Sequence, residues 1–124
     1  MNAFNMAKTA YANSSTPTRT PRGTEYDAFA RITHRLKSTS IDKSNFGAFA
    51  AALHDNKSLW SILAADVSDS ENTLPNELRG RIFYLYEFTA HHTSKVLRKE
   101  ETVDALIDIN TAVMCGLRSQ AGVL

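Results

Sequence analysis

Histidine and cysteine, the side chains that most often carry chemistry, are few in this sequence and unfavourably spaced. His91 and His92 are neighbours. Adjacent side chains on a helix point about 100° apart, so this pair cannot chelate one ion as an i, i+4 pair can. Cys115 lies near the predicted end of a helix, where the helix dipole disfavours a thiolate. We therefore predict a packed thiol at Cys115, and no catalytic or metal site.

The sequence also lacks the short motifs that mark enzymes. It has no glycine-rich phosphate loop, no Gly-x-Ser-x-Gly and no Cys-x-x-Cys. Glu100, Glu101 and Asp104 cluster where a helix is predicted to begin, and the helix dipole accounts for acidic residues there. We expect that the protein is not an enzyme and binds no cofactor.

Asn56 and Asn110 are the informative polar residues, because each interrupts the apolar stripe of a predicted helix. Burying an amide is costly unless the amide is hydrogen-bonded. Trp60, one turn after Asn56, adds an indole N–H that needs an acceptor. Two interpretations follow. Either these residues form hydrogen bonds that fix helix register, or they line a groove that accepts a peptide.

The elements that must position these residues are helices, because helical periodicity runs through the chain after residue 20. The predicted helices are Pro21 to Thr39, Lys43 to Val67, Leu74–Pro75 to about Arg98, and one that follows an N-cap at Thr102. The second is predicted to be continuous, and its alternative is a break at which Asn56 caps a new helix. The predicted fold is all-α, a compact bundle of about four helices.

The composition is that of an ordinary soluble protein, with 43% apolar and 22% charged residues in 124 and a net charge of +1. Residues 1–20 contain no acid and are predicted to form a flexible N-terminal tail, followed by a helical domain over residues 21–120. No apolar run is long enough for membrane insertion. The lone cysteine, without a recognisable signal peptide, predicts a cytoplasmic location.

Charge is unevenly distributed, since the part up to Lys43 is basic and the remainder is acidic. This asymmetry predicts either internal charge pairing or a docking patch for an acidic partner. Direct RNA binding is not expected, because aromatic residues for base stacking are sparse among the basic residues of the first helix.

The stretch NTLPNELRG predicts the start of the third helix. Pro75 suits a first turn, because its φ is preset and its missing N–H costs nothing there. Thr73 or Leu74 is then the predicted N-cap. Apolar side chains lie off the main stripe of this helix at Phe83, Tyr84, Tyr86 and Phe88. A helix that is apolar on more than one side is central in the fold or presents a second face to a partner.

Three stretches together resemble the flagellar biosynthesis regulator FlaF family of alphaproteobacteria. They are TPRGTEYDAF, NKSLWSILAADVSDSENTLPNELRGRI and LIDINTAVMCGLR. The matching signature residues are Asn56, Leu59, Trp60, Asp66, Asn72, Leu74, Pro75, Leu78, Arg79, Ile109, Asn110, Met114, Gly116 and Leu117. Gly80 and Cys115 depart from the family pattern. The resemblance covers nearly the whole chain, from about Tyr11 to Arg118.

This resemblance implies a secretion chaperone or export adaptor that binds flagellin and is required for flagellin production and filament assembly. The alternative is post-transcriptional regulation of flagellin synthesis through FlbT, a small protein that represses flagellin translation, or through flagellin mRNA. A third interpretation is a structural adaptor that forms a homodimer through Phe83, Tyr84 and Phe88. The sequence leaves the oligomeric state open.

The candidate partner-binding surface is a groove between the second and third helices, shaped at one end by the signature residues around the proline. Such a groove would accept an amphipathic helix of unpolymerised flagellin. Its predicted residues are Asn56, Leu59, Trp60, Leu63, Asn72, Leu74, Pro75, Leu78, Arg79, Ile82, Phe83, Tyr86 and Asn110. The alternative interpretation is that they are ordinary core residues.

Overall fold

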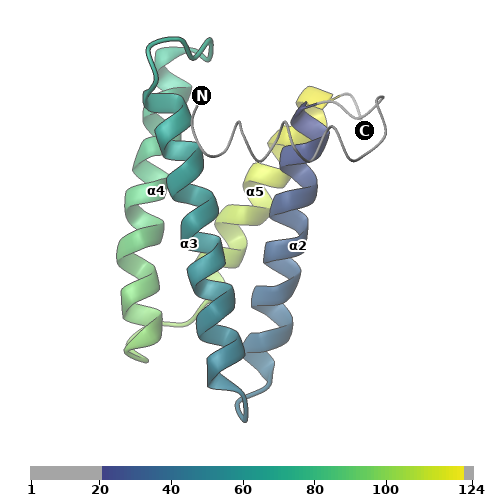
Figure 1. Cartoon of the computed structure of the whole chain (residues 1–124), viewed down its shortest axis with the longest axis vertical. Coiled ribbons are helices and arrows are strands. Elements are labelled where there is room, and N and C mark those ends of the chain that lie inside the picture. Colours follow the sequence, from purple (N-terminus) through teal and green to yellow (C-terminus); the bar gives the residue numbers. More distant parts are fainter. Residues whose placement is uncertain (1–20, 122–124) are drawn as a thin grey trace.

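The computed structural model describes residues 21–121, with side chains from 25 to 116, as an all-α bundle (Figure 1). Its helices are α2 (Pro21–Ile41), α3 (Phe46–Ser68), α4 (Asn76–Leu97) and α5 (Asp104–Ala121). The predicted fold class is confirmed, and α3 is one continuous helix with Asn56 inside it. The predicted flexible tail, residues 1–20, lies outside the described residues.

The helices pack in the spatial order α5, α2, α3, α4. The α2–α3 and α3–α4 pairs run antiparallel, and α5 packs along α2 (Figure 1). By contrast, α4 and α5 contact each other little, because they diverge from the turn that joins them. One side of α4 therefore lacks the neighbour that it would have in a closed four-helix bundle.

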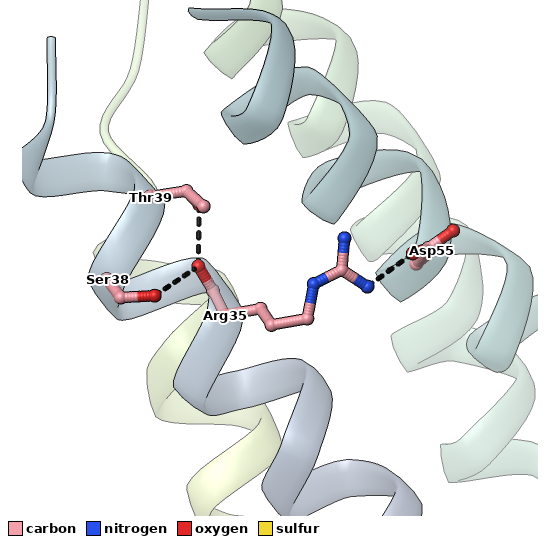
Figure 2. Close-up of polar contacts among 4 residues, drawn as sticks. All are labelled: Arg35, Ser38, Thr39 and Asp55. Atoms are coloured by element: carbon pink, nitrogen blue, oxygen red, sulfur yellow. Dashed lines mark hydrogen bonds and ion pairs between the residues drawn. The ribbon is translucent and has the colours of Figure 1, made fainter. Parts of the chain in front are cut away.

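The end of α2 lies beyond the predicted one, at Ile41 rather than Thr39. Thr39 and Ser38 donate their hydroxyl hydrogens to the Arg35 carbonyl (Figure 2), so these polar residues bond within the helix instead of ending it. Arg35 also joins α2 to α3, because its guanidinium donates to the Asp55 carboxylate at 2.5 Å. This ion pair is an example of the predicted internal charge pairing.

The start of α3 lies at Phe46 rather than at Lys43. Asn45 is the N-cap, since its Oδ1 accepts the Ala48 N–H at 3.0 Å. A side chain that binds a free amide of the first turn fixes where a helix begins.

The start of α4 lies one residue later than predicted, at Asn76. Pro75 takes the N-cap position itself, with a ψ of 145°, and its carbonyl accepts the Arg79 N–H at 3.0 Å. At the next turn, the predicted cap Thr102 accepts the Asp104 N–H through its hydroxyl at 3.4 Å, and α5 begins at Asp104.

Two apolar clusters fill the bundle, one toward each end. The first comprises Phe29, Leu59, Trp60 and Leu63. The second comprises Leu36, Ala52, Leu53, Val96, Val103 and Leu106. Between them each helix contributes a polar residue that is no more than 2% exposed: Thr33, Asn56, Thr89 and Asn110. We call these four residues the polar layer.

Candidate functional site

Asn110 of α5 is the centre of the polar layer. Its Oδ1 accepts the indole N–H of Trp60 at 3.0 Å. Its Nδ2 donates to Thr33 Oγ1 at 3.1 Å and to Asn56 Oδ1 at 2.8 Å. One amide thus joins α2, α3 and α5, as the structural interpretation of these asparagines requires. Hydrogen bonds in a dry interior specify helix register, because any shift leaves polar groups unpaired.

Among the described residues, no hydrogen bond between side chains joins Thr89 of α4 to the other three residues of the polar layer. Asn56 Nδ2 and Thr89 Oγ1 are buried and have no hydrogen-bond partner among the described residues. Unpaired buried polar groups cost free energy, typically about 1–3 kcal/mol each. At this level α4 is therefore held by apolar packing alone, and it is the helix least firmly tied to the polar layer.

The predicted groove through Trp60 is not an open surface in this structure. Trp60 is fully buried, and its ring meets Phe29 edge to face with 5.5 Å between centroids. Leu59 and Leu63 are also buried, and so are Asn56 and Asn110 of the polar layer. At these positions the structure agrees with the alternative interpretation as core residues, because side chains of α2, α4 and α5 pack around them.

The predicted residues around the proline form a turn that caps the end of α3. Asn72 donates its amide to the Asp66 carbonyl at 3.2 Å and accepts the Leu74 N–H at 3.0 Å. Arg79 donates from Nε to the Val67 carbonyl at 2.7 Å. It also donates from a terminal nitrogen to the Asp69 carbonyl at 2.9 Å. These two side chains satisfy carbonyls that the end of a helix leaves free, and they fix the start of α4 against α3.

Replacing Arg79 with alanine is expected to lower the free energy of unfolding by about 1–3 kcal/mol, because hydrogen bonds from a charged group to two carbonyls are lost. Arg81→Ala is the matched control. Arg81 is exposed, and its ion pair with Glu77 at 2.9 Å spans one helical turn. Such pairs contribute about 0.5 kcal/mol or less. Urea denaturation followed by circular dichroism measures both, and equal losses would contradict the capping role of Arg79.

The accessible part of the predicted surface lies in the first half of α4. The buried residues of α4 are Thr89, Thr93 and Val96, all in its second half. In the first half Leu78, Ile82 and Tyr86 are half-buried. Leu74, just before the helix, is half-buried as well, and Pro75 is exposed. A helix segment this rich in apolar residues without a buried one indicates an incompletely covered surface.

Two large side chains of this segment face solvent, Phe83 with 41% exposure and Tyr84 with 66%. Glu87 is exposed as well, and so is Gly80, where an added Cβ would meet no atom within 4 Å. Helical spacing places these residues together, opposite the side of α4 that packs on α3. We call Gly80, Phe83, Tyr84 and Glu87 the outer face of α4. The sequence predicted Phe83 and Tyr84 together as a possible homodimer contact, but Glu87 was missed, although its spacing from Phe83 and Tyr84 is the signal.

The candidate chemical groups are not assembled into a site. Within the described residues, no three His, Cys, Asp or Glu side chains gather closely enough to hold a metal ion. His92 stacks on Phe88, with 5.3 Å between ring centroids. Cys115 is exposed, so the prediction of a packed thiol is wrong. It lies five positions after Asn110, on the side of α5 away from the buried stripe.

A pocket lies at the other end of the bundle, between the α2–α3 and α4–α5 turns, with a volume of about 590 Å³. Its lining mixes Lys43 and Lys99 with Asp42, Glu101 and Asp104, so it favours no single ligand charge.

In residues 21–121, no helix has the length and apolar character required to cross a membrane.

Comparison with known proteins gives one match. The family model described as "Flagellar protein FlaF" matches residues 7–117 of the chain. No curated protein and no solved structure matches. The matched range includes all of α2, α3 and α4, and it begins before α2.

Proposed function

Because the chain belongs to the FlaF family of flagellar proteins, we propose that it binds flagellin before export, as a secretion chaperone or export adaptor. The observation that carries this proposal is the outer face of α4, where Phe83 and Tyr84 are 41% and 66% exposed. Neighbouring exposed aromatic side chains on a rigid helix are typical of protein-binding surfaces.

An amphipathic helix of flagellin suits this surface by its chemistry. Such a helix has an apolar stripe that favours aggregation when it is exposed, and burial against Phe83 and Tyr84 would remove that stripe from water. The half-buried Tyr86 borders the same surface, and its ring is already in edge-to-face contact with that of Phe83, with 5.9 Å between centroids. Ile82 instead packs against the first apolar cluster. A small contact of this kind releases its ligand readily, as export requires.

Titration calorimetry against monomeric flagellin tests the proposal. The double substitution Phe83→Ala and Tyr84→Ala is expected to raise the dissociation constant at least tenfold, a loss of about 1.4 kcal/mol. Ile41→Ala is the matched control, because Ile41 is 79% exposed and ends α2 at the opposite end of the bundle. The control is expected to bind as the parent does. Circular dichroism verifies that all variants are folded.

Two outcomes would count against this proposal in different ways. Saturable binding that the double substitution leaves unchanged would keep flagellin as the partner and move the site away from α4. Absence of heat and of a complex with the parent protein would reject flagellin, and FlbT would then be the partner to test by the same titration.

The alternative function is regulation of flagellin synthesis. Regulation by direct binding to RNA has less support than binding to flagellin. The basic residues of α2 were its basis, and Arg35 among them is engaged with Asp55. RNA binding in low salt that weakens steeply as salt is added would favour it.

For the homodimer, Phe88 is a poor contact because it is half-buried and stacked on His92. A concentration-dependent mass in solution would support self-association.

A further inference from the structure

The outer face of α4 has a chemical pattern that defines what can cover it. Phe83 and Tyr84 supply exposed aromatic surface, and Glu87 lies one turn further along on the same side. Glu87 forms no ion pair with any residue that the structure describes. Gly80, at the beginning of the face, leaves space because no side chain projects there. A complementary ligand therefore has large apolar side chains for the aromatic pair and a cation close to them for Glu87.

The first twenty residues of this chain carry that complementary pattern. Phe4, Lys8 and Tyr11 follow one another at spacings of four and three, which in a helix places them on one face with the cation in the middle. Lys8 and Arg19 are the charged side chains of residues 1–20, which contain no acid. Opposite charge and matching apolar surface thus occur in two parts of the same chain.

The tether between the two parts is long enough for them to meet. α2 and α4 both run antiparallel to α3 and begin at the same end of the bundle, where Arg79 binds the Val67 carbonyl (Figure 1). α2 and α4 both pack on α3, so their axes are at most two interhelical spacings apart, roughly 16–20 Å, and the outer face lies about 5–6 Å beyond the α4 axis. Residues 12–20 can span about 30 Å when extended. Such a tether gives a local concentration in the millimolar range.

The family comparison supplies an independent observation. The matched range begins at residue 7, fourteen residues before α2. The range that the family model matches therefore covers the positions of Lys8 and Tyr11 as well as α2, α3 and α4.

We propose that the N-terminal segment, residues 1–20, docks in cis on the outer face of α4, with Phe4 and Tyr11 against Phe83 and Tyr84 and with Lys8 paired to Glu87. A consequence that rests on the proposed function is that the docked segment competes with flagellin for the outer face of α4. If nine molecules in ten are docked, the apparent dissociation constant for flagellin is tenfold higher than for the open face.

Hydrogen exchange of the full-length protein, without flagellin, tests the docking itself. In the parent protein the amides of residues 4–11 are expected to exchange at least fivefold more slowly than in either Lys8→Glu or Glu87→Lys. Combining both substitutions restores opposite charges and is expected to recover most of the protection. Arg19→Glu is the matched control, because it makes the same charge change in the tether and is expected to leave the protection of residues 4–11 unaltered.

Exchange of residues 4–11 at the rate of an unstructured peptide in the parent would overturn the proposal. The proposal would also be overturned if neither Lys8→Glu nor Glu87→Lys lowered the protection of residues 4–11. The same holds if Arg19→Glu lowered it as much as Lys8→Glu does. Calorimetry then separates docking from function. Lys8→Glu is expected to lower the dissociation constant for flagellin by up to tenfold. If residues 4–11 are protected from exchange but the protein binds no flagellin, the docking proposal stands and the proposed function is rejected.

Discussion

Replacing Trp60 with alanine is expected to lower the free energy of unfolding by about 3–5 kcal/mol, the usual cost of deleting a large buried aromatic side chain. Trp60 is fully buried and packs edge to face on Phe29. The change also leaves Asn110 Oδ1 without the indole donor that it accepts from at 3.0 Å. Domains of this size have a total stability of about 5–15 kcal/mol, so the variant is expected to be largely unfolded at elevated temperature.

Trp60→Phe separates packing from hydrogen bonding. It keeps most of the ring and removes the N–H, so the expected loss is only about 1–3 kcal/mol. Trp60 is the single tryptophan of the chain, so both variants lose its fluorescence. Thermal and urea denaturation are therefore followed by far-ultraviolet circular dichroism. A Trp60→Ala variant with the stability of the parent would contradict the core position, and it would reopen the groove interpretation.

Replacing Asn110 with leucine is expected to cost about 3–5 kcal/mol, although leucine has the same number and branching of side-chain heavy atoms as asparagine. The loss has an electrostatic origin, because three buried groups lose their partner at once: Trp60 Nε1, Thr33 Oγ1 and Asn56 Oδ1. Each unpaired group contributes about 1–3 kcal/mol, and the sum is smaller than additive because the groups can rearrange.

Asn56→Leu is the sharper comparison, since the same change is made in the same layer. It removes one hydrogen bond to Asn110 and also removes Asn56 Nδ2, which has no partner in the described structure. We expect a smaller loss of stability than for Asn110→Leu. Thr111→Ala, at the exposed neighbouring position, is expected to change stability by about 0.5 kcal/mol or less. An equal effect of the two leucine substitutions would contradict the central role of Asn110 in the polar layer.

Much of the fold follows from the sequence, because apolar periodicity is a property of each helix alone. The unbroken rhythm through Asn56 predicted one continuous α3, and the structure confirms it. The helix ends were harder to predict. They depend on which short polar side chain binds which amide or carbonyl, as Asn45 does at the start of α3 and Thr39 at the end of α2.

The candidate site was less predictable, because burial depends on how helices are arranged around one another. The sequence indicated that Asn56, Trp60 and Asn110 need partners, but it does not reveal that Thr33 joins them from α2. It also left open whether Trp60 is core or groove. That choice depends on α2 and α5 covering one face of α3, an arrangement of residues far apart in the chain. Exposure of Phe83, which lies off the main stripe, follows from local spacing and was accessible to sequence analysis.

The arrangement of α2 against α5 has a consequence for synthesis on the ribosome. Thr33 and Asn110, which hydrogen-bond to each other, are 77 positions apart, and α5 is the main packing partner of α2. Translation delivers the N-terminal part of a chain first. During most of translation α2 therefore has its apolar face uncovered on the side that α5 later occupies, and the Trp60 indole N–H has no acceptor from Asn110. The last helix to be made is the one that completes the core, so a nascent chain interrupted before α5 would expose the surface that the finished protein buries.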